Sequence, residues 1–316
     1  MDWPNHSDAW REWRTAMSGS RMHHGWLLAG KSGLGKHDFA HAAARELVAE
    51  DGVAQPAGDH PDILTLTHLP KDDKEERKRE KGEPYEKKRN ITVGQIRGMQ
   101  QRLTTRPTLG ARRAIIIDPS DDMEKSASNA LLKSLEEPPQ GTFFLLVSHR
   151  PARLLPTIRS RCRMVRFPVL DEAMLRQFLS DDAPEADPAS VDAAIAACGG
   201  SPGIASAFIE HNLTGIAAIL SAIVAKGDHT LGQRASLVKA LGQRPNRAKI
   251  AAVLGLAQST LTHRIADRPA KAQLAAIEAN RELGILAGQA ATYNFDTGLL
   301  IMEAAGLLAR AGQASD

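Results

Sequence analysis

The stretch His24–His37 reads HGWLLAGKSGLGKH and decides the fold of this chain. A short apolar run, Trp26–Ala29, leads into Gly30–Lys36, which has the spacing G-x-x-x-x-G-K, and a helical pattern follows. Glycines at this spacing let backbone N–H groups close around phosphates, and the lysine reaches the terminal phosphates. The next residue should be Ser or Thr, whose hydroxyl holds Mg²⁺, but here it is His37. The sequence therefore predicts a phosphate-binding loop with one part replaced.

Apolar runs alternate with helical patterns on both sides of this loop, from residue 26 to residue 168. The predicted strands are 26–29, 63–66, 114–117, 143–147 and 164–167, and we expect 63–66 to be buried. The predicted helices are one within 1–23, then 38–49, 91–103, 126–137 and 154–159. Near-continuous apolar strands separated by helices are typical of a doubly wound parallel sheet, with the loop at the carboxyl end of a strand.

After residue 171 the strand signals end and every segment has helical periodicity. The first predicted helices are 173–179, 189–198 and 202–210, and further Ala- and Leu-rich helices follow from 211 to 310. We expect three domains: 1–168 with the phosphate loop, a small helical domain 169–211, and an all-helical domain 212–316. Lys71–Asn90 is almost entirely charged, so we predict a solvated insertion or charged hairpin; a phosphate-contacting arm is the alternative.

Composition excludes several classes of protein. The 316 residues are 42% hydrophobic and 24% charged, as in globular proteins, and a net charge of +3 does not by itself argue for nucleic-acid binding. No apolar run approaches the roughly 20 residues of a membrane span, and the N-terminus has no leader pattern, so we expect a cytoplasmic protein without membrane association. Cys162 and Cys198 form no C-x-x-C pair, which predicts two packed thiols and no metal site.

ATP hydrolysis on such a sheet needs more than the loop. A strand should end in Asp for Mg²⁺, closely followed by a Glu that orients water. Asp118 ends the strand 114–117, but Pro119-Ser120 follows it, and we expect Asp121, Asp122 and Glu124 to lie out of place. Ser148, after the strand 143–147, is the candidate sensor of the γ-phosphate. The missing hydroxyl and glutamate predict inefficient hydrolysis and weak binding of ATP or ADP.

Two motifs resemble a known family. Asn129–Pro139 (NALLKSLEEPP) and Phe143–Cys162 (FFLLVSHRPARLLPTIRSRC) resemble the clamp-loader branch of the AAA+ ATPases, most closely the delta-prime family of the bacterial DNA polymerase III clamp loader. The resemblance covers about 24–210 and includes the phosphate loop and Gly199–Ala205 (GGSPGIA). Over the last hundred residues only the helical character agrees.

The resemblance implies a role for Arg161. Ser160-Arg161-Cys162 matches the family's SRC motif, whose arginine reaches the ATP of a neighbouring subunit as an arginine finger. A surface arginine paired with a nearby acid is the alternative, and Arg159 is a second candidate contact. Motor subunits carry an arginine after a Gly-Ser pair in the lid, whereas Pro202-Gly203 follows Gly200-Ser201 here. Many relatives have a four-cysteine zinc module, but Glu50–His60 has no cysteine, so no zinc is predicted.

The resemblance further implies an α/β AAA+ P-loop domain, a helical lid and a helical collar that holds a ring of subunits. The expected function is a non-motor subunit of the DNA polymerase III complex, acting with gamma/tau motor subunits and a delta subunit to load the sliding clamp onto primed DNA. No cofactor is required. The residues of the degenerate nucleotide site are Gly30, Gly33, Gly35, Lys36, His37, Asp118 and Ser148. The alternatives are an ATP-hydrolysing motor subunit and a nucleotide-gated binding protein unrelated to replication.

Overall fold

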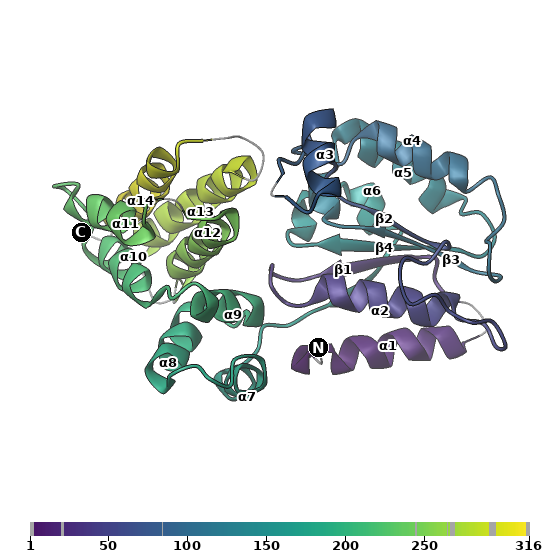
Figure 1. Cartoon of the computed structure of the whole chain (residues 1–316), viewed down its shortest axis with the longest axis horizontal. Coiled ribbons are helices and arrows are strands. Elements are labelled where there is room, and N and C mark those ends of the chain that lie inside the picture. Colours follow the sequence, from purple (N-terminus) through teal and green to yellow (C-terminus); the bar gives the residue numbers. More distant parts are fainter. Residues whose placement is uncertain are drawn as a thin grey trace. The chain divides into compact units, whose positions relative to one another are not determined.

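The structure is a computed structural model that describes residues 3–19, 22–83, 85–243, 245–263, 265, 269–290 and 295–313 (Figure 1). Its contacts divide the chain into two units, which are described separately. Unit 1 is Met1–Pro70 with Lys88–Val169, and unit 2 is Lys71–Lys87 with Leu170–Asp316. The division into three domains at residues 168 and 211 stays a prediction.

Unit 1 contains a five-stranded parallel sheet in the order β2-β3-β4-β1-β5. Its strands are β1 (Gly25–Ala29), β2 (Ile63–Leu66), β3 (Arg113–Ile117), β4 (Thr142–Ser148) and β5 (Arg163–Arg166). Leu27 is in register with Leu146, so β1 and β4 end at the same edge. The predicted strands and their parallel arrangement are confirmed. The prediction that 63–66 is buried is wrong, because β2 is an edge strand in which only Leu64 is buried.

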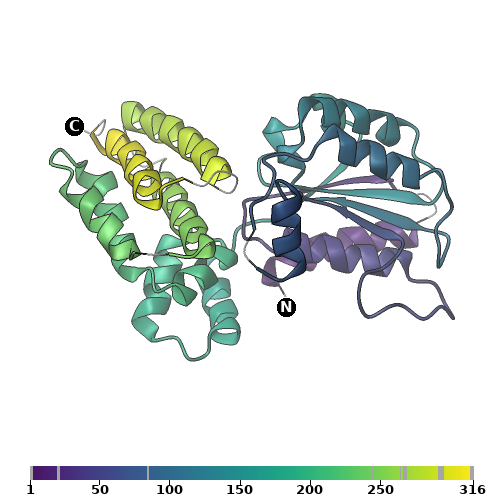
Figure 2. The same cartoon turned by 45° about the horizontal axis from the view of Figure 1, so that its top comes forward.

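Helices cover both faces of this sheet, as Figures 1 and 2 show. On one face lie α1 (Ser7–Ser18), which follows the short turn η1 (Pro4–His6), and α2 (Lys36–Val48). On the other face lie α4 (Val93–Arg102), α5 (Lys125–Glu136) and α6 (Pro156–Arg159). Short 3₁₀ turns, η2 (Ser120–Asp122) and η3 (Pro151–Arg153), follow β3 and β4. A Thr92–Gln95 capping box begins α4, and Pro138-Pro139 follows the end of α5.

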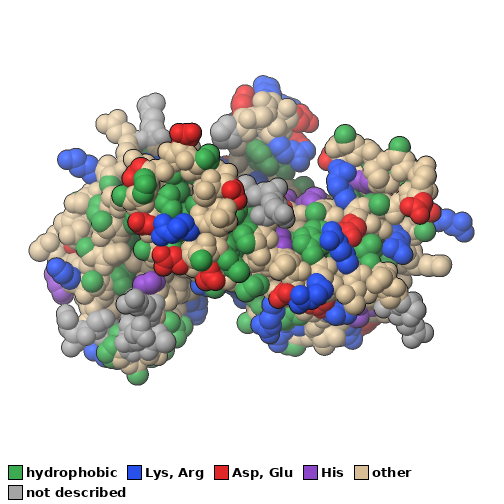
Figure 3. Space-filling model, turned by 90° about the horizontal axis from the view of Figure 1, so that it is seen from below, with side chains coloured by type: hydrophobic (Ala, Val, Ile, Leu, Met, Phe, Trp, Pro, Cys, Tyr) green, Lys and Arg blue, Asp and Glu red, His purple; other side chains and the backbone are tan. Residues whose placement is uncertain are grey.

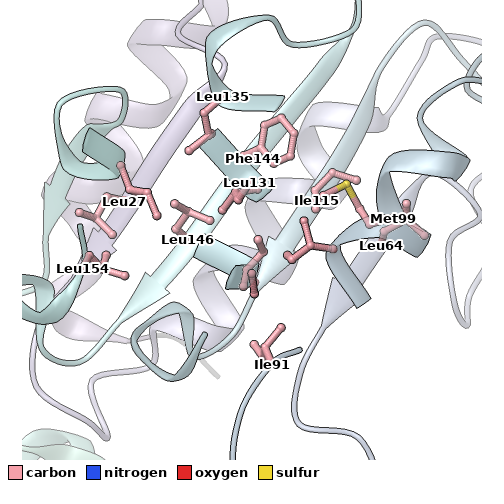
Figure 4. Close-up of a cluster of buried hydrophobic side chains, with 14 of the residues drawn as sticks. Leu27, Leu64, Ile91, Met99, Ile115, Leu131, Leu135, Phe144, Leu146 and Leu154 are labelled. Atoms are coloured by element: carbon pink, nitrogen blue, oxygen red, sulfur yellow. The ribbon is translucent and has the colours of Figure 1, made fainter. Parts of the chain in front are cut away.

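Alternate side chains of the central strands pack into two cores. Leu27, Ile115 and Phe144 join Met99 of α4 and Leu131 of α5 in one cluster (Figure 4). The intervening residues are buried as well, because the opposite face is covered by aromatic side chains of α1 and α2. Trp26 of β1 contacts Trp13 at a ring separation of 5.0 Å, and Trp13 also contacts Phe39. The strands have continuous apolar runs because both faces of the sheet are covered by helices.

The secondary-structure elements of unit 2, over the residues that the structure describes, are helices. Its helices after residue 170 are α7 (Glu172–Asp182), α8 (Pro188–Ala197), α9 (Pro202–Glu210), α10 (Thr214–Lys226), α11 (Gly232–Leu241), α12 (Arg247–Thr262), α13 (Ala270–Ala290) and α14 (Thr297–Gln313). Side-chain caps begin several of them, including Asp187 at α8 and Ser201 at α9. The helical character predicted from residue 171 onward is confirmed over the described residues.

The charged segment Lys71–Lys87 also belongs to unit 2 and contains an unpredicted helix, α3 (Asp73–Glu80). The backbone N–H of Lys71 donates to Glu86, which closes the segment as a hairpin, as expected. Asp72 caps α3, and the buried Glu75 accepts hydrogen bonds from Lys78 and from the backbone of Glu86. Capping and ion pairing thus order a segment that has almost no apolar surface to bury.

Candidate phosphate site and arginine

The phosphate loop lies between β1 and α2, at the carboxyl edge of the sheet. Gly33 and Gly35 have φ angles of 76° and 69°, a left-handed conformation that favours glycine. A Cβ added to Gly30 would lie 2.6 Å from the carbonyl oxygen of Phe167, so the chain is too close there for a side chain. The loop therefore has the backbone shape that its glycines predict, and α2 begins at Lys36.

Lys36 is buried within this loop, with 2% of its surface exposed. Its Nζ donates to the carbonyl oxygen of Lys31. Burial lowers the pKa of Lys36 to about 8, and the nearby carboxylates of Asp118 and Asp121 partly oppose that shift. The lysine is thus placed beside two carboxylates at the point where terminal phosphates bind in a complete loop.

His37 and Asp118 form a direct pair. Nδ1 of His37 lies 2.6 Å from Oδ2 of Asp118, although the two residues are 81 positions apart. Since an ionised carboxylate only accepts hydrogen bonds, Nδ1 carries the hydrogen. The hydrogen bond with Asp118 raises the pKa of His37, and burial opposes the shift. The expected neighbourhood of these two residues is therefore present, with an imidazole where a hydroxyl would stand.

Asp121 lies past the end of β3, as expected, and the structure shows what its carboxylate contacts there. Turn η2 brings Asp121 back to the end of β4, where it is buried and accepts a hydrogen bond of 2.5 Å from the Ser148 hydroxyl. It also accepts hydrogen bonds from the backbone N–H groups of His149 and Arg150. Ser148 is fully buried, and its hydroxyl is directed at Asp121. The Ser-Asp-Asp sequence after the strand was the available signal, since Ser and Asp favour tight turns.

Further histidines and the N-terminal turn η1 lie close to the loop, and no sequence motif predicts this arrangement. His149 is largely buried, and burial together with Lys36 lowers its pKa. The ring of His41 lies 4.5 Å from that of His37. Nε1 of Trp3 donates to Asp38 over 2.9 Å, and the ring of His6 bonds the carbonyl oxygen of Leu34 over 2.8 Å. These contacts tie turn η1 to the phosphate loop and to the first turn of α2.

Arg161 lies at the amino-terminal ends of the strands, whereas the phosphate loop lies at their carboxyl ends. Its backbone faces Gly25, where an added Cβ would lie 2.9 Å from the Arg161 carbonyl oxygen. Gly25 begins β1 and the loop follows its end, so about 13 Å of strand separates them. The guanidinium pairs with Glu136 at 2.7 Å and donates to the carbonyl oxygen of Thr157, with the side chain 35% exposed. The structure thus groups Lys36, Asp118 and Ser148 and leaves Arg161 apart.

Cys162 follows this arginine and packs against Gly25. Neither Cys162 nor Cys198 is in a disulfide, and burial raises the pKa of Cys162 to about 12. We predict that iodoacetamide at pH 8 alkylates Cys162 about 10³-fold more slowly than an unfolded thiol, because only the thiolate reacts. Mass spectrometry of the labelled peptides would measure both rates, with the urea-unfolded chain as control. Native labelling within tenfold of that control would contradict the prediction.

The described part of the chain contains no group of three or more His, Cys, Asp or Glu side chains arranged to hold a metal ion. No single described helix has both the length and the apolarity of a membrane span, and α9 and α10 meet those criteria only as a pair bent by 119°. On the face drawn in Figure 3, Lys and Arg side chains are interspersed with Asp and Glu.

The sheet order and the loop between β1 and α2 define an α/β P-loop fold of the AAA+ class. The family model described as "DNA polymerase III, delta subunit" matches residues 5–171, more than half of the chain, and the chain belongs to this family. This confirms the resemblance drawn from the sequence motifs.

Curated relatives carry matching names. DNA polymerase III subunit delta′ of Pseudomonas aeruginosa is 33% identical over 59% of this chain and 56% of the relative. The Escherichia coli subunit delta′ is 29% identical over 60% and 55%. The chain spans about half the length of these relatives. Among solved structures, a DNA polymerase III gamma subunit-related protein of Thermotoga maritima matches with a TM-score of 0.44 and 18% identity, over 97% of this chain and 99% of that chain.

Proposed function

We propose that this chain is a non-motor subunit of a DNA polymerase III clamp loader that supplies Arg161 to the ATP site of a neighbouring subunit. The observation that carries the proposal is the position of Arg161. Arg161 is half-buried beside the start of β1, whereas the chain's own phosphate loop follows the end of that strand, about 13 Å away. An arginine placed there is available to a second chain rather than to its own loop.

The chain's own loop supports a non-motor role. The hydroxyl that should hold Mg²⁺ is replaced by His37, which is bonded to Asp118. The hydroxyl of Ser148, the candidate sensor, is directed at Asp121. In the lid, Ser201 caps α9, and Pro202-Gly203 follows it where motor subunits have an arginine. Three parts of the hydrolytic machinery are thus absent or occupied, which argues against the alternative of a motor subunit.

The proposed partners are gamma/tau motor subunits and a delta subunit, and through the assembly a sliding clamp and primed DNA in the cytoplasm. Helix α13 offers support for the collar. Leu274, Ile277 and Ile285 share one helical face and are 60%, 55% and 49% exposed. Exposed apolar side chains aligned on a bundle helix are typical of subunit interfaces. A collar contact through α13 would cover them.

We predict that the purified chain shows no ATP turnover that depends on its own lysine. Steady-state phosphate release should be the same for wild type and Lys36→Ala, because neither places a hydroxyl-bound Mg²⁺ and a water-orienting glutamate at the γ-phosphate. Turnover abolished by Lys36→Ala would instead favour the motor-subunit alternative. Co-purification with motor subunits tests the other alternative, since a protein unrelated to replication would not assemble with them.

A further inference from the structure

The position of the phosphate-loop metal ion is blocked in this chain. In complete loops of this kind, the Ser or Thr hydroxyl after the lysine and the strand-end Asp hold Mg²⁺. Mg²⁺ requires near-octahedral oxygen ligands at about 2.0–2.1 Å. Here the corresponding residues are His37 and Asp118, and Nδ1 of His37 lies 2.6 Å from Oδ2 of Asp118. The two groups that would share the ion bond each other instead.

The second carboxylate at this edge does not restore a metal site. One oxygen of Asp121 accepts from Ser148 Oγ at 2.5 Å, and the other accepts from two backbone N–H groups, including that of Arg150 at 2.9 Å. Both oxygens therefore already have donors, and Asp121 is buried. The residues present do not fit Mg²⁺.

The remaining parts of the loop still suit a phosphate group. Gly33 and Gly35 hold the backbone in its phosphate-binding shape, and the Lys36 ammonium lies inside the loop. Two carboxylates lie beside Lys36 and oppose an anion, those of Asp118 and Asp121. Asp121 already accepts hydrogen bonds from Ser148 and two backbone N–H groups, whereas Asp118 is the carboxylate that Mg²⁺ would screen in a complete loop. His37 covers that carboxylate with a donated hydrogen bond. The imidazole thus performs the screening that an ion performs in complete loops.

We infer that this loop binds the phosphates of a nucleoside diphosphate without a divalent metal, with the His37 imidazole in the position of the ion. This binding concerns the chain's own loop and is independent of Arg161. A failed test here would leave the proposed function in place, because that function requires only the neighbour's ATP.

Isothermal titration of the full chain with ADP tests the inference. The dissociation constant of the wild type should be the same within about twofold in EDTA and in millimolar Mg²⁺. His37→Ser should bind at least tenfold more weakly in EDTA and regain affinity with Mg²⁺, because a hydroxyl and an uncovered Asp118 recreate the metal ligands. Ala42→Ser, which introduces the same side chain at an exposed position of α2, is the matched control and should behave as the wild type.

Three results would overturn the inference. The first is wild-type ADP binding that weakens at least tenfold in EDTA, and the second is no ADP binding in either buffer. The third is a failure of inorganic pyrophosphate to displace ADP in EDTA. Displacement of ADP by pyrophosphate in EDTA is the expected result, because both occupy the loop through their phosphates. ADP that pyrophosphate fails to displace would bind elsewhere on the chain.

Discussion

Replacing Arg161 with alanine should lower ATP hydrolysis at the neighbouring site of a reconstituted clamp loader by about 10³-fold or more. An arginine finger stabilises the charge that develops on the transferred phosphoryl group, and its removal typically costs about 10³–10⁵ in rate. In the isolated chain Arg161 pairs with Glu136 in a partly exposed contact. Exposed pairs contribute about 0–1 kcal/mol, so this contact gives way readily to a phosphate. The pair with Glu136 therefore does not lock the arginine away from a phosphate.

Single-turnover hydrolysis measures this effect best, in complexes whose other ATP sites have been disabled. Arg159→Ala is the matched control, because Arg159 is an exposed arginine at the end of α6, two residues before Arg161, and we expect a change of less than about threefold. Glu136→Gln removes the resting partner and should leave the rate within the same range. Gel filtration should show intact assembly for every variant. Undiminished hydrolysis by Arg161→Ala would show that this arginine is not a finger, and a loss with Arg159→Ala would reassign the role.

The parts of the fold that sequence patterns predict are those determined locally. The loop glycines, the apolar strands, the helix capped by Thr92 and the helix that ends before Pro138 each depend on a few consecutive residues. The parallel sheet follows from the alternation of those elements. The edge position of β2 depends on strand order, which no local pattern determines, so its partial burial was missed.

The candidate site divides in the same way. Lys36, His37, Asp118 and Ser148 follow strands or the loop directly, and strand ends meet at one edge of a parallel sheet. The bond between His37 and Asp118 and the pairing of Arg161 with Glu136 depend on side-chain directions that only tertiary packing determines. A residue's neighbours along the chain are thus a poor guide to its hydrogen-bond partners.

Asp121 is the clearest example of a residue whose hydrogen-bond partners lie far along the chain. Of the substitutions proposed for this chain, those at Asp121 should reduce stability most. We expect Asp121→Ala to lower the free energy of unfolding of unit 1 by about 3–5 kcal/mol. The change would leave the Ser148 hydroxyl and the backbone N–H groups of His149 and Arg150 without their acceptor in a buried site. Each unsatisfied buried group costs about 1–3 kcal/mol, a large fraction of the 5–15 kcal/mol by which domains are stable.

Urea unfolding followed by tryptophan fluorescence would measure this loss, because all four tryptophans lie in unit 1. Asp121→Asn retains one acceptor oxygen, so its free energy of unfolding should fall by about half as much as that of Asp121→Ala. Asp122→Ala is the matched control, since the adjacent carboxylate is 30% exposed and its ion pairs are long, 3.4 Å to His68 and 3.9 Å to Arg150, so we expect about 1 kcal/mol or less. An Asp121→Ala chain within 1 kcal/mol of the wild type would mean that solvent or a rearranged turn replaces this carboxylate, and Asp121 would then not hold Ser148 in place.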